Sequence, residues 1–288
     1  MPSPDLALDL SIDAGAASIE QDRARLRDFV QAHPRLFVLT GAGCSTDSGI
    51  PDYRDTNGGW KRPQPVTYQA FMGETATRQR YWARSLVGWR RFGRAQPNAT
   101  HRALARLEQQ GRVTTLLTQN VDGLHQAAGH QSVIDLHGRL DEVRCMSCDL
   151  RLPRDTFQRS LVERNPAWAL LDAGDAPDGD ADLDGRDFSQ FIVPPCPTCG
   201  GILKPDVVFF GENVPRHRVD AAVTSLNEAD AMLVVGSSLM VFSGYRFAAA
   251  AAREGKPIAA VNLGKTRADP LLSLKIEQSC AQALAFVS

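Results

Sequence analysis

Residues 35–55, RLFVLTGAGCSTDSGIPDYRD, decide the fold class of this chain. The apolar run at residues 35–40 is typical of a short buried strand, and it leads directly into Gly41 and Gly43. Glycines at such a turn let backbone amides approach a pyrophosphate, with a helix N-terminus behind them. On the glycines alone, a structural turn is about as plausible as a cofactor site.

The turn departs from the dinucleotide fingerprint of dehydrogenases. The third glycine of GxGxxG would fall at position 46, which is Thr46, and residues 61–66, KRPQPV, lack the expected ribose-binding acid. The tail GIPDYRD is polar and kinked by proline, so it can lie over a ligand. An enzyme that breaks the nicotinamide–ribose bond needs such a cover, because water must be excluded from an oxocarbenium-like centre.

Other segments repeat the alternation of strand and helix. Apolar runs that end in small polar residues occupy 112–120, 230–238 and 256–264, and helical patterns occupy 19–33, 75–92 and 101–111. This alternation predicts an α/β fold with a Rossmann-like doubly wound parallel sheet and ligands at the carboxyl ends of its strands.

Two stretches interrupt the alternation and indicate inserted parts. We expect an N-terminal tail at 1–18, a Rossmann-like domain from 19–60, 101–138 and 205–288, a helical insertion at 61–100 and a zinc-binding small domain at 139–204. The acidic loop 172–187 matches the first half of an EF-hand at Asp180, Asp182, Asp184 and Gly185, but Phe191 stands where a bidentate Glu is required. An exposed, solvated loop is the favoured interpretation.

Composition excludes several classes of function. With 288 residues, 43% hydrophobic content and a net charge of −1, the chain suits one or two globular domains without a basic field for nucleic acid or anionic membrane. No apolar run approaches a bilayer span, and the N-terminus lacks a basic region and an apolar core. We expect a bacterial-type cytoplasmic protein, with an organelle as the alternative.

Four of the six cysteines form two CxxC pairs, Cys145 with Cys148 and Cys196 with Cys199. Four thiolates close a tetrahedral zinc shell and leave no place for water, so the pairs predict one structural Zn²⁺. A disulfide interpretation is disfavoured in an intracellular chain.

Seven motifs occur in the order found in sirtuins, the NAD-dependent protein-lysine deacylases. They are GAGCSTDSGIPDYRD, TQNVDGLH, LHG, the CxxC pairs, KPDVVFFGE, VVGSSL and VNLG, and together they span roughly residues 20–285. The stretches RQRYWARSLVGW, APDGD and SGYRF resemble the class II branch more narrowly.

The resemblance implies a reaction. In the family, the acyl-lysine carbonyl oxygen attacks C1′ of the NAD ribose, nicotinamide leaves, and an alkylimidate forms. A general base then activates the ribose hydroxyls, the acyl group moves to the 2′-oxygen, and the products are deacylated lysine and O-acyl-ADP-ribose. A base that works near neutral pH suits histidine, and LHG supplies it as His137.

The resemblance also assigns roles to other positions. Asn120 and Asp122 belong in the nicotinamide pocket, Asn120 with a catalytic role, Gln119 bonds ribose, and Tyr53 shields the ribose after nicotinamide leaves. The other expected NAD contacts are Gly41, Ala42, Gly43, Ser45, Asp52, Arg54, Gly236, Ser237, Ser238, Asn262, Leu263, Gly264 and Cys280. A buried structural role is as plausible for Cys280.

The expected partner is an acyl-lysine protein substrate, whose extended backbone would pair with Val207, Val208 and Phe209. Tyr81 and Arg84 resemble the pair with which acid-preferring sirtuins hold an acyl carboxylate, and an Arg on a solvated helix is the alternative.

The sequence also departs from the family. Cys44 stands where the family often has Ala or Ile, and FSGYR replaces a segment with proline in many sirtuins, which puts one wall of the peptide cleft in doubt.

Three alternatives remain. Mono-ADP-ribosyl transfer from the same NAD site is the first. A zinc-ribbon binding module is opposed by TQNVD and His137, and a dehydrogenase is opposed by Thr46 and the missing acid.

Overall fold

A six-stranded parallel sheet forms the centre of the computed structural model, which describes residues 4–61, 65–172, 175–176, 180–183 and 185–287. The strand order is β11-β10-β9-β1-β2-β3. Counted from β3, this is the order of a doubly wound dinucleotide-binding sheet, in which the winding reverses between β1 and β9. The predicted fold class is confirmed. The strands are β1 (Leu36–Thr40), β2 (Val113–Thr118), β3 (Val133–Asp135), β9 (Ala231–Val235), β10 (Ile258–Val261) and β11 (Leu274–Ile276).

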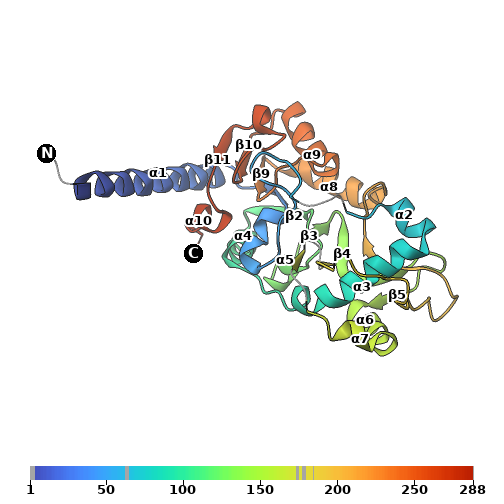
Figure 1. Cartoon of the computed structure of the whole chain (residues 1–288). Helices are drawn as coiled ribbons and strands as arrows, with labels where there is room; N and C mark the ends of the chain where they lie inside the picture. Colours follow the sequence, from blue (N-terminus) through green and yellow to red (C-terminus); the bar gives the residue numbers. More distant parts are fainter. Residues whose placement is uncertain (1–3, 62–64, 173–174, 177–179, 184, 288) are drawn as a thin grey trace.

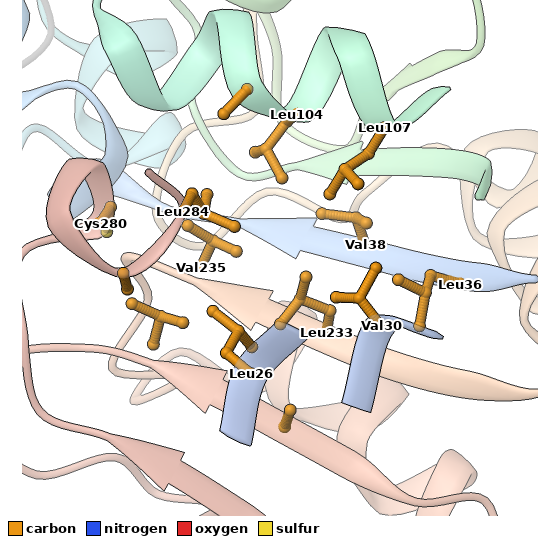
Figure 2. Close-up of a cluster of buried hydrophobic side chains, with 14 of the residues drawn as sticks. Leu26, Val30, Leu36, Val38, Leu104, Leu107, Leu233, Val235, Cys280 and Leu284 are labelled. Carbon is orange, nitrogen blue, oxygen red and sulfur yellow. The ribbon is translucent and has the colours of Figure 1, made fainter. Parts of the chain in front are cut away.

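Both faces of this sheet are buried. In β1, Leu36 and Val38 belong to one core cluster and Phe37 and Leu39 to another, as the two-residue period of a strand requires. One face packs against α1 (Pro4–Ala32), α4 (Ala99–Gln109) and α10 (Cys280–Ala283), the other against α8 (Arg216–Glu228) and α9 (Phe242–Arg253). Figure 2 shows side chains from α1, α4 and the C-terminal segment meeting around Val38 and Leu233.

A second, smaller core lies beside the sheet (Figure 1). Its antiparallel sheet has the order β5-β4-β8, and the fully buried Trp82 belongs to this core. Most residues of this core come from the two predicted insertions, 61–100 and 139–204, which therefore pack against each other. The elements are α2 (Tyr68–Gly73), α3 (Thr75–Phe92), β4 (Gly138–Cys145), β5 (Arg151–Pro153), α6 (Arg154–Arg164), α7 (Pro166–Ala169) and β8 (Leu203–Val207).

The first helix differs from its predicted range. It ends at Ala32, two residues before Pro34, as expected, but it begins at Pro4 and not at residue 19. Proline in the first turn is compatible with a helix. Figure 1 shows the N-terminal part of α1 extending away from the rest of the chain.

The acidic loop also differs from its prediction. Ala181 and Leu183 are buried, at 1% and 4% exposure, because β7 (Asp180–Ala181) pairs with β6 (Asp175–Ala176) and packs against α3. The Asp180 carboxylate accepts a hydrogen bond from Arg84 Nε at 2.9 Å. The solvated-loop interpretation is therefore wrong for Ala181 and Leu183, and Asp184 lies outside the described residues.

Within the described part of the chain, none of the helices combines the length and the apolar character that crossing a membrane requires.

Leu233→Ala tests the core beneath α1 and α4. Leu233 is fully buried in the middle of β9, so we expect the substitution to lower the free energy of unfolding by about 2–5 kcal/mol. Urea unfolding followed by circular dichroism measures the change. Val223→Ala, at an exposed position of α8, is the control, with an expected change within about 0.5 kcal/mol. If both substitutions changed the free energy of unfolding by the same amount, Leu233 would not contribute to the core that supports the sheet.

Candidate active site

Two glycine turns meet where the winding of the sheet reverses. The Gly41 amide donates to the carbonyl of Val235 at 3.2 Å, and the Gly43 amide donates to the carbonyl of Gly236 at 2.9 Å. Gly236 has a φ of +63°, and a Cβ there would lie 2.3 Å from the Cys44 nitrogen. Glycine is therefore required, because both its conformation and its contact exclude a side chain. Two short 3₁₀ turns, η1 (Ala42–Cys44) and η2 (Thr46–Ser48), continue the chain from β1.

A cavity of about 350 Å³ opens at this junction. Most predicted site residues line it, and they come from segments far apart in the sequence. They are Gly41, Ala42, Gly43, Ser45, Asp52, Tyr53, Arg54, Gln119, Asn120, Asp122, His137, Val207, Val208, Phe209, Gly236, Ser237, Ser238, Asn262 and Leu263. Gly264, Cys280, Tyr81 and Arg84 do not line it.

The hydroxyl of Ser45 connects two predicted nicotinamide-pocket residues. Its Oγ donates to Asp122 Oδ2 at 2.7 Å and accepts from Asn120 Nδ2 at 3.0 Å. Asp122 Oδ1 accepts from the Leu124 amide at 2.9 Å. Burial raises the pKa of Asp122, while these hydrogen bonds lower it. The carboxylate and the amide are thus held in fixed directions before any ligand arrives.

His137 lies just before β4, where the two cores meet. Its Nδ1 is 3.0 Å from the carbonyl of Gln119, and its Nε2 is 2.8 Å from Ser243 Oγ. The His137 carbonyl accepts from the Val208 amide at 2.7 Å. The next residue, Gly138, has a φ of +83°, and a Cβ there would lie 1.9 Å from the Asp206 carbonyl. The site therefore fixes both ring nitrogens and the backbone of this histidine.

The pKa of His137 lies at about 4, below the value that sequence reasoning associates with a base at neutral pH. Burial is the main cause, and Arg218 and Arg246 lower the pKa further by charge repulsion. The hydrogen bond with the Gln119 carbonyl acts in the opposite direction. At neutral pH the imidazole is therefore uncharged and can accept a proton.

The proline-kinked loop covers the cavity without forming a helix. The Arg54 guanidinium lies 4.0 Å from the Trp60 ring centroid and donates to the Gly58 carbonyl at 2.7 Å. The Tyr53 ring meets Trp60 edge-on, with ring centroids 6.1 Å apart. These contacts brace the loop that carries Asp52, Tyr53 and Arg54, which all line the cavity.

Two residues outside the cavity have other surroundings. Cys280 is buried, with its Sγ 3.8 Å from the Gly43 carbonyl, and burial raises its pKa to about 12. Tyr81 is half-buried and packs against Phe71 and Phe209, with ring centroids 5.4 and 5.2 Å away. For both, the predicted contact with a ligand stays a prediction.

Sequence reasoning missed several cavity residues, among them Trp60, Phe210, Ser243 and Arg246. Ser243 and Arg246 belong to FSGYR, which the sequence analysis treated as a doubtful wall of the cleft. The structure shows that this segment begins α9 and lines the cavity. The sequence signal that could have indicated this role was the position of FSGYR shortly after the strand at 230–238, because ligands bind at the carboxyl ends of such strands.

The two CxxC pairs come together in the smaller core. Their four Sγ atoms lie within 4.8 Å of one another, with 3.5 Å between Cys145 and Cys199 and 3.7 Å between Cys148 and Cys196. Zn–S bonds of about 2.3 Å in a tetrahedron place sulfurs about 3.8 Å apart, so these spacings fit zinc. A closed shell of four thiolates makes the metal structural.

The fold and the cavity define a doubly wound nucleotide-binding protein with an added zinc module. A model of the Sir2 family matches residues 41–243. An "NAD-dependent protein deacetylase" of Xanthomonas axonopodis pv. citri is 72% identical over 266 residues, covering 92% of this chain and 91% of that protein. An "NAD-dependent protein deacetylase 2" of Bradyrhizobium diazoefficiens is 68% identical over 262 residues, covering 91% of this chain and 96% of that one.

Solved structures of Sir2 proteins are also similar to this chain. A structure described as "Sir2-p53 peptide-NAD+" has a TM-score of 0.73 and 29% identity, covering 91% of this chain and 95% of its own. A structure of "Sir2Tm bound to a propionylated peptide" has a TM-score of 0.70 and 28% identity, covering 92% of this chain and 96% of its own. The chain belongs to the Sir2 family.

Cys196→Ser tests the zinc site. Removing one thiolate opens the shell, so we expect loss of bound zinc and local unfolding of the smaller core, since zinc binding and folding are coupled. Atomic emission measures the metal, and limited proteolysis detects the unfolding. Cys44→Ser is the matched control, because Cys44 lies outside the four-cysteine cluster and the variant should keep one zinc per chain. Retention of zinc by Cys196→Ser would contradict the assignment.

Proposed function

We propose that this cavity removes acyl groups from protein lysines at the expense of NAD, with His137 as the general base. The chain is an NAD-dependent protein deacetylase of the Sir2 family, the activity named for relatives that are 65–72% identical. One observation carries the assignment of roles: Asn120, Asp122 and His137 line the same cavity as the glycine turn after β1. A binding module would need none of these three side chains in such an arrangement.

Nicotinamide is assigned to the part of the cavity around Asn120 and Asp122. A carboxamide has two N–H donors, and the Asp122 carboxylate and Asn120 Oδ1 can accept from them, because both hydrogens of Asn120 Nδ2 already go to the Gly41 carbonyl and Ser45 Oγ. The hydroxyl of Ser45 supports this role, because it holds both side chains at 2.7 and 3.0 Å. The glycine turn would cradle the pyrophosphate, and Asn262 would bond the adenosine ribose.

The chemistry assigned to His137 follows from its tautomer. Its Nδ1 faces the Gln119 carbonyl, which can only accept, so Nδ1 carries the proton. Its Nε2 then carries the lone pair and is the basic nitrogen. This nitrogen would take the proton of a ribose hydroxyl after nicotinamide has left, and the resulting alkoxide would attack the acyl carbon.

The substrate protein is assigned to the cleft between two segments that line the cavity. Val208, Phe209 and Val241, the residue before α9, all line the cavity, and we assign Val208 and Phe209 to one side of the peptide and Val241 to the other. Phe210 and Phe242 are exposed, at 37% and 59%, which leaves apolar surface beside the cleft. An extended peptide with its acyl-lysine pointing inward suits such a cleft.

Preference for an acidic acyl group stays a prediction. The Arg84 guanidinium is paired with Asp180 at 2.9 Å, and burial raises the pKa of Asp180 to about 6. An acyl carboxylate would therefore have to replace Asp180 as the partner of Arg84. The cavity lining does not include either Arg84 or Tyr81.

His137→Ala tests the general base. We expect turnover of an acetyl-lysine peptide with NAD to fall about 10²–10⁴-fold, the usual contribution of general base catalysis. Mass spectrometry of free lysine and O-acyl-ADP-ribose measures it. His217→Ala, at an exposed position of α8, should keep full activity. Transfer of label from NAD to protein, without deacylation by the unmodified enzyme, would instead favour mono-ADP-ribosyl transfer.

Arg84→Met tests acyl preference. If Arg84 binds an acyl carboxylate, turnover of a succinyl-lysine peptide should fall about tenfold or more relative to the acetyl-lysine peptide, because a charge-assisted contact is lost. Steady-state kinetics on a panel of acetyl, butyryl, lipoyl, succinyl and hydroxymethylglutaryl peptides gives the ratio. Arg164→Met, at an exposed position of α6, is the control. If the ratio of succinyl-lysine to acetyl-lysine turnover did not change, Arg84 would have no role in binding the acyl group and would serve only in its ion pair with Asp180.

A further inference from the structure

The lone pair that makes His137 basic is already engaged. Because Nδ1 carries the ring proton toward the Gln119 carbonyl, the hydrogen bond at Nε2 must be donated by the Ser243 hydroxyl, at 2.8 Å. A substrate hydroxyl therefore cannot bond Nε2 unless Ser243 moves away or passes a proton. Ser243 lines the same cavity as His137, so its hydroxyl lies where substrate can reach it.

The backbone that carries Ser243 has little freedom to move away. A Cβ on the neighbouring Gly244 would lie 2.6 Å from Gln119 Nε2, so α9 packs directly on the residue that orients the histidine. The Gln119 side chain is itself fixed, because its Oε1 accepts from Ser237 Oγ at 2.7 Å. The Gln119 backbone is fixed as well, since its amide donates to the Thr40 carbonyl at 3.0 Å. These contacts hold the positions of Ser243, Gln119 and His137 relative to one another.

From this geometry we propose that Ser243 relays the proton between a ribose hydroxyl and Nε2 of His137. This proposal rests on the proposed function. The O–H bond of the substrate breaks and a new O–H bond forms on Ser243, while the original Ser243 proton moves to Nε2 and uses its lone pair. Ser243 ends unchanged, His137 ends as imidazolium, and the substrate oxygen keeps the electron pair with which it attacks the acyl carbon.

A hydroxyl suits this position better than other polar groups. It donates to Nε2 while the histidine is neutral, and it accepts from Nε2 once the histidine is protonated. An amide donor would serve only the first state, and a carbonyl only the second. Ser243 can therefore hold the ring through both states of the reaction.

Two assays separate the relay from binding. Exchange of labelled nicotinamide into NAD, in the presence of acetyl-lysine peptide, reports the steps before the base acts. Formation of O-acyl-ADP-ribose reports the later acyl transfer. We expect Ser243→Ala to lower acyl transfer about tenfold or more while nicotinamide exchange stays within about threefold. Ser243→Thr keeps the hydroxyl and should restore acyl transfer.

A double variant tests whether the two residues act together. Residues of one relay are not additive, so His137→Ala with Ser243→Ala should be no slower in acyl transfer than His137→Ala alone. Thr224→Ala removes a hydroxyl at an exposed position of α8 and is the matched control for both assays. Thermal unfolding of each variant confirms that the compared proteins are folded.

Three results would overturn the relay. They are normal acyl transfer by Ser243→Ala, a parallel loss of exchange and acyl transfer, and a failure of Ser243→Thr to restore the reaction. Absence of any NAD-dependent deacylation by the unmodified, zinc-loaded enzyme would overturn the proposed function itself. The unmodified enzyme in the same assays therefore distinguishes the two failures.

Discussion

The contact of two backbone turns at the reversal point of the sheet is the constraint on which the site depends. The Gly43 amide bonds the Gly236 carbonyl at 2.9 Å, and a side chain at Gly236 would overlap the backbone at Cys44. This contact sets where the chain goes after β1 and thus where Ser45 lies. A side chain here would push the ends of β1 and β9 apart and open the cavity floor.

The proposed catalytic residues come from both cores, and neither core would be sufficient alone. Gln119 directly follows β2 of the large sheet, His137 directly precedes β4 of the smaller core, and Ser243 lies in the first turn of α9. The His137 carbonyl accepts from the amide of Val208, the residue that follows β8, and the sheet of β8 also carries Cys145. A zinc ion held by the four cysteines would therefore support His137 indirectly, through this sheet.

Burial decides the charge states of the site. The pKa values of His137 and Asp122 move in opposite directions, because desolvation disfavours the charged form of each. His137 is uncharged before substrate arrives, and Arg218 and Arg246 oppose its protonation.

The sequence by itself determined the strand–helix alternation, the glycine turn and the two CxxC pairs, because these depend on local patterns and short spacings, while most cavity residues followed from its resemblance to sirtuins. It could not reveal β3 and β11, each of only three residues, or the burial of Ala181 and Leu183 against α3. It also gave no reason to pair Ser243 with His137, which lie 106 residues apart. Tertiary structure decided these features, because hydrogen bonds and desolvation between distant segments exist only once the two cores have packed.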